Sequence, residues 1–323
     1  MIQKVLSYLK RMSREIPSIK DRRSPILLMY LDFIYCFIVY GTVLDQYTKG
    51  GFYKLNRSER RKSVTYRKIC KIYSRSITEE YVHVLQNKPE FNKFFAKLIK
   101  RKWLYSNEMD IEQFSKLCGK VSEIIIKPIN ESEGRGIRRI DIPKDKASIS
   151  KLFGMLKKEQ LIIEECLQSH SETSFGVRSL NTIRVHSIID AAGNVHLVKS
   201  LLRVGVGDAI VDNYCAGGCI YEVDNLTGTI CSASYSKKYE VSEYHPGTQI
   251  RMIGRKIPYW EELKKLVAAA HKDLPQIKFI GWDVAITENG PELIEGNHHP
   301  DYDLLEFVGQ RFWWSEFKKY LNL

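Results

Sequence analysis

A change of character near Val121 constrains the fold of this chain more than any other feature of its sequence. Before this point, apolar residues recur at helical spacing, as Phe91, Phe95 and Leu98 do, and few Gly or Pro interrupt them. After it, short β-branched runs alternate with loops that contain Gly and Asn. We therefore expect residues 1–118 to be mostly helical and the remainder to have an α+β fold.

The second part of the chain predicts strands, several of them joined by hairpins, and a small number of helices. Helices are expected over residues 145–160 and 260–271, where apolar residues follow a helical period. With 323 residues, the chain is long enough for about two domains. Strand-like runs occupy residues 124–127, 137–140, 161–167, 183–189, 195–204, 219–223, 279–286 and 292–295.

The composition excludes several classes of protein. The chain is 44% hydrophobic and 27% charged, which excludes wholesale disorder, collagen and low-complexity chains. Its seven cysteines are irregularly spaced, so they predict no disulfide framework and indicate a reducing compartment. The first 25 residues are basic and lack the continuous apolar segment of a signal peptide, so we expect a cytoplasmic protein.

The positive charge of the chain is confined to its first third. Residues 1–102 contain 23 Lys and Arg against 8 Asp and Glu, a net charge of +15, whereas the rest of the chain has a net charge of −3. Such a basic region can bind nucleic acid, anionic lipid or an anionic substrate. It can equally be the solvated surface of a helical region.

Within this basic region, residues 26–44 form a long apolar stretch, ILLMYLDFIYCFIVYGTVL. Its length raises the question of a transmembrane helix. Asp32 interrupts the stretch and Gly41 follows soon after, so we expect a buried helix within a helical N-terminal region. The alternative is a helix that contacts a membrane interface.

The C-terminal hairpin carries the strongest chemical pattern. Side chains alternate between the two faces of a strand, so Glu295 and Asn297 share a face. If a loop at residues 287–291 closes the hairpin symmetrically, Asp283 lies directly opposite Glu295. Two carboxylates and an amide oxygen are ligands that suit Mg²⁺. The alternative is the polar face of an exposed hairpin, which the strongly apolar flanking residues disfavour.

Three basic residues lie in apolar strands. Lys127 ends one such strand and precedes a loop that contains Gly134 and Gly136, which is the arrangement of a phosphate clamp but matches neither a Walker A nor a Rossmann motif. Arg184 and Arg203 each lie within a strand. Arginines in such positions have anionic partners, either a phosphate or a carboxylate of the protein itself.

Five motifs, in this order, resemble the sugar-transfer-associated family of the ATP-grasp superfamily, which is related to glutamate-ligase-like enzymes. They are IIIKPINESEGRGI, SLNTIRVHS, LLRVGVGDAIVDNYCAGG, HPGTQIRMIGRKIPYW and GWDVAITENGPELIEGN, and the similarity extends over about residues 50–310. The resemblance implies an ATP-grasp fold, in which two α+β lobes hold ATP, preceded here by the helical basic region. We expect the helical region over residues 1–86, a small lobe over 87–163 and a large catalytic lobe over 164–323.

The resemblance also implies roles for individual residues. In the family, two lysines bind the phosphates of ATP, a loop closes over the triphosphate, a hinge reads adenine through its backbone, and a nearby side chain contacts the ribose. The matching residues here are Lys88 and Lys127 at the phosphates, Ser132, Gly134 and Gly136 in the loop, Glu164, Glu165 and Leu167 in the hinge, and His170 or Glu172 at the ribose. The implied Mg²⁺ ligands are Asp283, Glu295 and Asn297.

One position departs from the pattern of D-alanine–D-alanine ligase-like relatives, which carry an arginine two residues before the metal-binding aspartate. Here that position is Gly281. An arginine that stabilises the transferred phosphate must then come from elsewhere, and Arg184 and Arg203 are the candidates for this catalytic role. The basic helical region also differs from the usual α/β N-terminal subdomain.

By this resemblance, the chain is expected to be an ATP-dependent carboxylate–amine ligase that acts through an acyl phosphate. Its substrates would be a carboxylate of an anionic or lipid-linked saccharide, such as a uronic acid of a surface polysaccharide or its precursor, and an amine or amino acid. Peripheral contact with the inner face of an anionic membrane would give access to lipid-linked intermediates.

Two alternatives to a ligase stay open. One is a phosphotransferase that passes the γ-phosphate to a sugar hydroxyl, because the motifs of the family do not separate the two reactions. The other is a nucleic-acid-binding protein that uses the basic first third. This second alternative leaves the acidic hairpin unexplained, so we expect no nucleic-acid partner.

Overall fold

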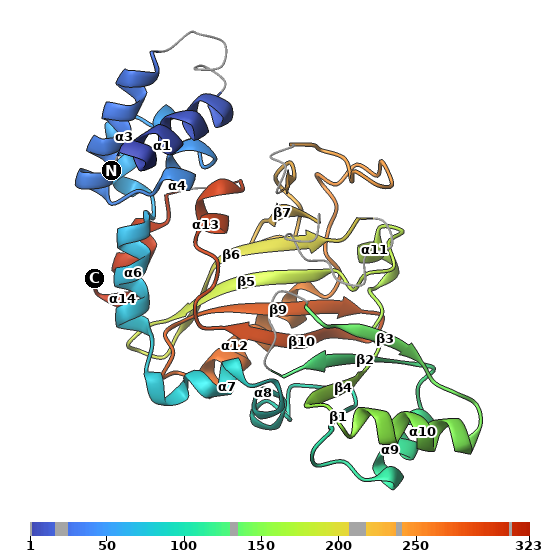
Figure 1. The fold of residues 1–323 in the computed structure, drawn as a ribbon. Helices are drawn as coiled ribbons and strands as arrows, with labels where there is room; N and C mark the ends of the chain where they lie inside the picture. The colour runs from blue at the N-terminus through green and yellow to red at the C-terminus, as the bar shows by residue number, and fades with distance from the viewer. Residues whose placement is uncertain (1, 17–24, 130–134, 207–217, 237–240, 310–311) are drawn as a thin grey trace.

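The computed structural model describes residues 2–16, 25–129, 135–206, 218–236, 241–309 and 312–323. Figure 1 shows a group of helices at the N-terminal end, a large sheet in the middle and a smaller sheet beside it. The expected α+β class is confirmed, because both sheets are antiparallel and the helices gather at the N-terminus and around the sheets.

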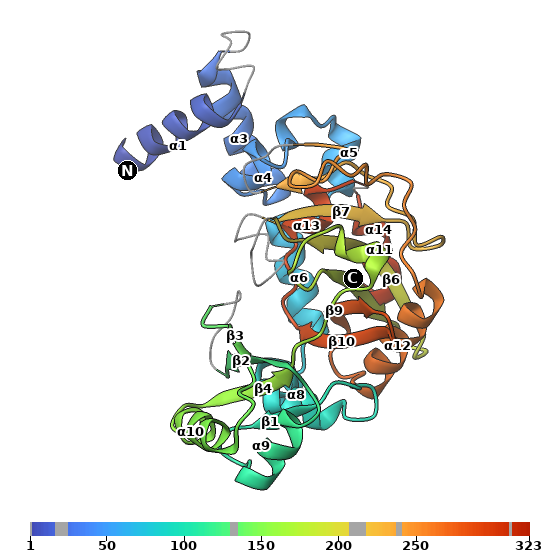
Figure 2. The same ribbon diagram turned by 90° about the vertical axis from the view of Figure 1, so that its right-hand side faces the viewer.

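The N-terminal helices share a small core of their own. It is formed by α1 (Ile2–Glu15), α3 (Ile26–Tyr40), α4 (Leu44–Thr48) and the short η1 (Phe52–Lys54), and Met12, Phe33, Cys36, Tyr47 and Phe52 are buried in it. Figures 1 and 2 both show α1 and α3 at the end of the molecule that lies away from the smaller sheet. These helices therefore form a distinct layer of the fold.

The prediction that residues 26–44 form a buried helix is wrong for most of that helix. The buried residues of α3 are Phe33, Cys36 and Tyr40, which lie on one face, and most of its other apolar side chains are exposed. The helix ends at Gly41, whose φ of 71° allows its N–H to donate back to the last turn. The stretch is apolar on every side, but the protein covers only one of its faces.

The next helices join the N-terminal region to the large sheet. They are α5 (Arg57–Lys62), α6 (Tyr66–Ser76), η2 (Glu79–Tyr81), α7 (Val82–Gln86) and α8 (Lys88–Phe94). Ile69 and Ile72 of α6 pack with Phe279 of the sheet and with Phe317 of the C-terminal helix α14 (Trp314–Leu321). The helices α6 and α14 thus cover one part of the same sheet face (Figure 1).

The smaller sheet has the order β1-β4-β2-β3, with every neighbouring pair antiparallel. Its strands are β1 (Trp103–Tyr105), β2 (Glu123–Pro128), β3 (Arg138–Asp141) and β4 (Leu161–Glu165), and it packs with α9 (Ile111–Cys118) and α10 (Lys146–Leu156) around Phe114 and Ile163. The described part of residues 1–118 is mostly helical, as predicted, and β1 is the exception within it. It is three residues long, too short for a period-two pattern to appear.

The large sheet has the order β10-β9-β5-β6-β7-β8 and is also antiparallel throughout. Its strands are β5 (Thr182–Ile189), β6 (Val195–Val204), β7 (Cys219–Val223), β8 (Tyr235–Ser236), β9 (Phe279–Thr287) and β10 (Gly290–Asn297). The helix α12 (Trp260–Asp273) packs on one face through Leu263 and Val267, against Val185 and Trp282. The short helices α11 (Ser171–Ser174) and α13 (Asp303–Phe307) flank the sheet.

Candidate active site

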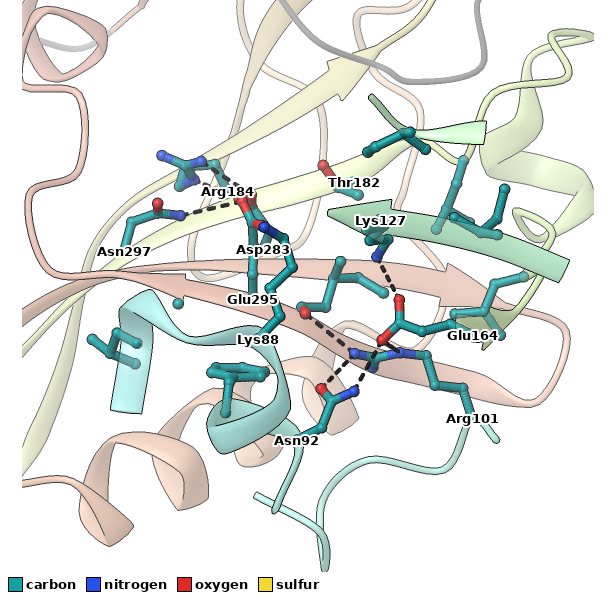
Figure 3. Close-up of a pocket in the computed structure, with 18 of the residues that line it drawn as sticks. Lys88, Asn92, Arg101, Lys127, Glu164, Thr182, Arg184, Asp283, Glu295 and Asn297 are labelled. Atoms are coloured by element: carbon teal, nitrogen blue, oxygen red, sulfur yellow. Dashed lines mark hydrogen bonds and ion pairs between the residues drawn. The ribbon is translucent and has the colours of Figure 1, made fainter. Parts of the chain in front are cut away.

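A cavity of about 550 Å³ lies where the two sheets meet, on the sheet face opposite α12. The smaller sheet contributes residues of β2 and β4, and the large sheet contributes residues of β5, β6, β9 and β10 (Figure 3). Its charged and amide-bearing lining includes Lys88, Asn92, Arg101, Lys127, Glu164, Arg184, Arg203, Asp283, Glu295 and Asn297.

Asp283 and Glu295 lie directly opposite each other in β9 and β10, as the sequence predicts. The reason differs from the expected symmetric loop. The strands are joined by a tight turn in which Gly290 pairs with Thr287, and that register alone would place Ile294 opposite Asp283. A β-bulge at Ile294 shifts the register by one residue and brings Glu295 into that position. The bulge therefore creates the carboxylate pair.

The two arginines meet the same carboxylate from the other side. Arg184 lies opposite Asp283 in the β5–β9 register, and its Nε and Nη2 both donate to the carboxylate, the latter over 3.0 Å. Arg203 of β6 brings its Nη1 to 3.2 Å from Asp283 Oδ2. The alternative of a carboxylate partner for each arginine is thus the one observed, and Asp283 is the partner of both. Figure 3 shows its pairing with Arg184.

The two carboxylates differ in how strongly they hold a proton. Burial disfavours the charge of Asp283, but Arg184 and Arg203 outweigh it and hold the pKa of this carboxyl well below its usual range. Burial, together with the negative charge of Asp283, raises the pKa of Glu295. Asn297 lies beside Glu295, with its Nδ2 3.5 Å from Glu295 Oε1. A cation placed between these oxygens would relieve the repulsion that raises the Glu295 pKa.

Gly281 leaves space that other residues occupy. A Cβ at this position would lie 2.5 Å from Pro300 Cβ and 3.2 Å from the Cδ of Arg184. Pro300 is held in turn from the N-terminal region, because the Tyr73 hydroxyl donates to its carbonyl oxygen over 2.6 Å. The arginine that relatives carry on this strand therefore has no room here, and Arg184 reaches the same area from the neighbouring strand.

The two predicted phosphate-binding lysines both line the cavity. Lys127, near the end of β2, places its Nζ 2.5 Å from Glu164 Oε2 in β4. Lys88 begins α8, and its Nζ donates to the carbonyl oxygen of Pro128 over 3.1 Å. The two ammonium groups thus come from different elements, and both line the cavity (Figure 3).

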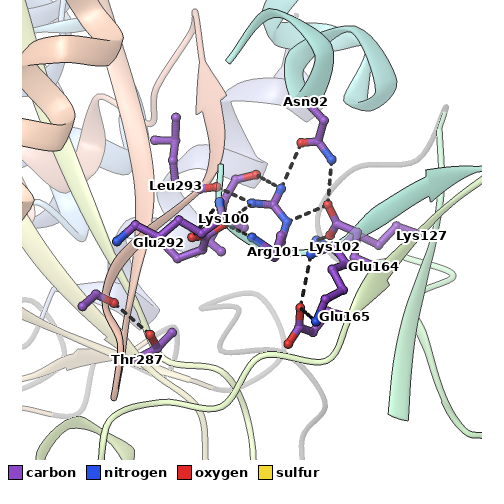
Figure 4. Close-up of polar contacts among 12 residues, drawn as sticks. Asn92, Lys100, Arg101, Lys102, Lys127, Glu164, Glu165, Thr287, Glu292 and Leu293 are labelled. Carbon is purple, nitrogen blue, oxygen red and sulfur yellow. Dashed lines mark hydrogen bonds and ion pairs between the residues drawn. The ribbon is translucent and has the colours of Figure 1, made fainter. Parts of the chain in front are cut away.

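Glu164 belongs to a buried polar network that the sequence did not reveal (Figure 4). Its carboxylate accepts from Arg101 Nε over 2.8 Å and from Asn92 Nδ2 over 3.0 Å. Although burial opposes the charge of Glu164, Arg101 and Lys127 hold the pKa of this carboxyl well below its usual range. A carboxylate predicted to act near adenine through its backbone therefore has a side chain that organises the surrounding cations.

Arg101 extends this network to the large sheet. Its Nη1 lies 3.2 Å from Glu292 Oε1 and also donates to the carbonyl oxygen of Leu293, while its Nη2 donates to the carbonyl oxygen of Ile294 over 3.3 Å. The Arg101 side chain is only 2% exposed. It thus holds the backbone on both sides of the bulge that positions Glu295, and it connects that bulge to Glu164.

The remaining predicted nucleotide residues divide into three groups. Glu165 and Leu167 line the cavity beside β4. His170 is not among the described residues that line it: its ring caps α11 by accepting from Glu172 N–H over 3.1 Å and lies 3.3 Å from Glu288. Ser132 and Gly134 lie outside the described residues.

Gly136 is described, and its glycine has a structural reason. Its φ of 69° lies in the left-handed region, and a Cβ there would approach Pro128 Cγ to 2.8 Å. The chain therefore returns from the loop close to the end of β2, where Lys127 lies.

This geometry can now be compared with that of known families. The sequence model of the sugar-transfer associated ATP-grasp family matches residues 71–318. The chain belongs to this family. The match covers more than two thirds of the chain and begins within α6, so the described helices α1, α3, α4 and α5 precede it. A search of curated proteins finds no match.

Solved structures of ATP-grasp ligases are similar in fold. The ATP-grasp ligase PsnB, complexed with minimal precursor, Mg and ADP, has a TM-score of 0.47 and 13% identity over 76% of this chain and 61% of that chain. The ADP complex of purK, N5-carboxyaminoimidazole ribonucleotide synthetase, gives a TM-score of 0.48 and 9% identity over 81% of this chain and 59% of that chain. D-alanyl-alanine synthetase A from Vibrio cholerae gives 0.42 and 16%, over 74% and 65%.

The chain thus spans about three fifths of the length of the solved structures that it matches first. The expectation of ATP and Mg²⁺ as cofactors agrees with membership of the ATP-grasp family. Among the residues that the structure describes, no helix combines the length and the apolar character needed to cross a membrane.

Proposed function

We propose that this family member is an ATP-dependent carboxylate–amine ligase. The observation that carries the proposal is the row of Arg184, Asp283 and Glu295 across β5, β9 and β10, which faces Lys127 across one cavity. Such a row offers oxygen ligands for a cation beside fixed positive charges. This is the arrangement that transfer of a highly charged phosphoryl group requires.

Asp283, Glu295 and Asn297 would hold Mg²⁺. Their donors are two carboxylates and an amide oxygen, which are the hard ligands that Mg²⁺ takes, and the remaining positions would be filled by phosphate oxygens and water. The raised pKa of Glu295 supports this assignment, since it reflects two buried carboxylates without enough positive charge between them. When bound, Mg²⁺ would neutralise the charge of the phosphates.

The cationic side chains would divide the remaining work. Lys88 and Lys127, which line the cavity, would bind the phosphates. By the family resemblance, Ser132, Gly134 and Gly136 stay candidates for phosphate binding. Arg184 and Arg203 would stabilise the transferred phosphoryl group, because their pairing with Asp283 holds them beside the metal ligands. Backbone groups at residues 164–167 would bind the adenine. His170 or Glu172, at α11, would contact the ribose if the nucleotide extends toward that helix.

The reaction would proceed in two steps. A substrate carboxylate attacks the γ-phosphorus of ATP, forming an acyl phosphate and releasing ADP. An amine then attacks the acyl carbon, forming the amide and releasing phosphate. We propose a uronic acid or another carboxylate of a saccharide as the first substrate and an amino acid or amine as the second. The family description and the basic N-terminal region support this choice.

The decisive experiment identifies the products. The protein is incubated with ATP, Mg²⁺ and panels of amines with uronic-acid acceptors, and the mixture is analysed by mass spectrometry together with phosphate release. A ligase yields ADP, free phosphate and a product heavier than its acceptor by the amine minus water. A product that gains a phosphoryl group without free phosphate would instead identify a phosphotransferase.

A further inference from the structure

The exposed face of α3 is the largest apolar feature of the surface that the structure describes. Eight of its large apolar side chains are between 37 and 63% exposed, whereas the other large apolar side chains with comparable exposure are scattered over the rest of the chain. They are Leu27, Leu28, Leu31, Ile34, Tyr35, Phe37, Ile38 and Val39. Contiguous apolar patches of this kind mark sites of interaction on soluble domains.

The spacing shows that four of these eight residues form one stripe. Leu27, Leu31, Ile34 and Ile38 follow the i, i+4, i+7, i+11 pattern, so they lie along one side of the helix. The buried residues Phe33 and Cys36 lie on the opposite side, against α1 and α4. The core of the N-terminal region is thus complete without the stripe.

The surroundings of α3 are strongly positive. All four described acidic residues between 2 and 62 have partners within the region: Glu15 with Arg11, Asp32 with Arg60, Asp45 with Lys49, and Glu59 in the cap of α5. Exposed basic residues outnumber them, namely Lys10, Arg14, Lys54, Arg57, Arg61, Lys62 and Arg67. Arg67 reaches α3 itself, since its Nη2 donates to the carbonyl oxygens of Phe37 and Ile38.

We propose that the exposed stripe of α3 docks on the surface of an anionic lipid bilayer. The helix has 15 residues and is about 22 Å long, shorter than the roughly 30 Å hydrocarbon layer, and Asp32 forms an ion pair on it. It therefore lies in the interface rather than across the membrane. Apolar side chains enter the headgroup boundary, and the basic residues around them attract the anionic headgroups.

The net positive charge of the N-terminal region favours an anionic bilayer over a second copy of the chain as the occupant of the stripe. A dimer through α3 would bring two regions of the same net charge together, since residues 1–102 carry +15. An anionic bilayer complements both the apolar stripe and this charge. The family match begins only at residue 71, so the docking surface is an addition to the catalytic part.

The test is co-sedimentation of the full chain with vesicles. One set contains equal parts of phosphatidylglycerol and phosphatidylcholine, and the other contains phosphatidylcholine alone. We expect sedimentation with the anionic vesicles in about 0.1 M salt and much less in about 1 M salt, where the Debye length falls from about 10 to about 3 Å. Protein that stays in the supernatant in about 0.1 M salt overturns the proposal.

Two variants locate the surface. Leu27→Ser, Leu31→Ser and Ile38→Ser together are expected to weaken vesicle binding by about tenfold or more, because each removes apolar area that the bilayer would cover. The matched control, Met155→Ser with Leu226→Ser, changes side chains that are 58% and 82% exposed elsewhere and leaves binding unchanged. ATP turnover without vesicles stays unchanged in both variants, because these residues lie outside the cavity.

Two further outcomes would contradict the proposal. Vesicle binding that the triple variant does not weaken would place the contact elsewhere. A protein that is dimeric by light scattering, becomes monomeric in the triple variant and ignores vesicles would show that a second copy occupies the stripe. Neither outcome bears on the ligase reaction, which is measured without lipid.

Discussion

Asp283 and Glu295 are paired across two strands, but they respond to pH in opposite directions. Glu295 has a pKa above its ordinary value of 4.5, so the folded protein binds its proton more tightly than the unfolded chain does. Its contribution to stability is therefore present below about pH 4.5 and is lost as the pH rises through its folded pKa. Asp283 has a lowered pKa, and its contribution is lost only as the pH falls below 3.8.

This difference predicts how Mg²⁺ affects stability. We expect metal-free protein to lose stability as the pH rises above 4.5 and through the raised pKa of Glu295, because Glu295 ionises beside Asp283. Mg²⁺ should reduce this loss, because it compensates the second negative charge. Thermal unfolding measured across this range with and without Mg²⁺ checks the prediction, and parallel curves with identical slopes would contradict it.

Glu295→Gln isolates the same carboxylate. The amide is neutral, so the metal-free variant should be at least as stable as the parent at pH 7 and should show a flatter pH dependence. Turnover of ATP should fall by a factor on the order of 10²–10³, as when a group that stabilises transition-state charge is lost. Asp283→Asn is a poorer test, because it also leaves Arg184 and Arg203 without their shared partner.

Lys127→Met tests the phosphate side of the cavity. The variant keeps an apolar stem of similar length but removes one charged contact, so ATP affinity should fall by about 1.5–3 kcal/mol, or roughly 10- to 150-fold. Glu164 retains Arg101 and Asn92, which should preserve the fold. Lys93→Met is the control, since Lys93 is half exposed and pairs with Glu108 outside the cavity. Equal ATP affinity in the two variants, by titration calorimetry, would remove Lys127 from the site.

At the scale of elements, the position of Glu295 depends on a bulge that Arg101 holds open. The bulge adds Ile294 to β10, and the guanidinium satisfies the carbonyl groups of Leu293 and Ile294 that such a distortion leaves exposed. The guanidinium of Arg101 also forms an ion pair with Glu164, which in turn pairs with Lys127. A single buried cation thus connects the phosphate side of the cavity with the metal side.

Arg101→Met should disturb both sides at once. Removing one partner of a buried ion pair costs about 3–5 kcal/mol, and here two carboxylates lose a partner. Beyond this loss of stability, the Mg²⁺ concentration needed for half-maximal ATP turnover should rise, because Glu295 loses its fixed register. Lys102→Met is the control. Lys102 is the next residue in the chain, and its exposed ammonium group lies 3.7 Å from Glu165. A purely structural role would lower stability without changing the Mg²⁺ requirement.

The strands of both sheets could largely be predicted from the sequence, whereas this network could not. Strands are recognisable in the sequence from β-branched runs and turns. The sequence also predicts the pairing of Asp283 with Glu295, but this pairing depends on a bulge at Ile294 that counting along the hairpin does not reveal. Arg101 stands among Lys97, Lys100 and Lys102, and local sequence does not tell one buried cation from three exposed ones. Its partners Glu164 and Glu292 are 63 and 191 residues away, so only the folded chain brings them together.

Across the whole molecule, the helical N-terminal region is bound to the sheet that carries the site. Val64 and Ile69 are fully buried in the cluster that contains Phe279, and the Val64 N–H donates to Glu306 over 2.8 Å. The exposure of α3 could not be predicted from the sequence. A helix that is apolar on every side is predicted to be buried, whether or not the protein covers all of its sides. The family match, which begins at residue 71, therefore leaves out part of the structural core.

Two shortened chains test this boundary. Residues 57–323 keep Val64 and Ile69, so this chain should fold cooperatively and retain ATP turnover. Residues 71–323 lose both side chains, and loss of such buried residues costs about 2–5 kcal/mol each. We expect a much lower midpoint of thermal unfolding for the shorter chain. Equal midpoints for the two chains would show that the N-terminal region is dispensable for the core.

Gly281 has a consequence for how such a site can evolve. Its missing side chain, the Pro300 ring above it and the Arg184 stem beside it fill one space together. An arginine introduced at 281 would collide with Pro300, and removing Arg184 first would leave Asp283 with one cation fewer. Supplying this positive charge from position 281 would therefore require concurrent changes at Gly281, Pro300 and Arg184, because the three residues share one space.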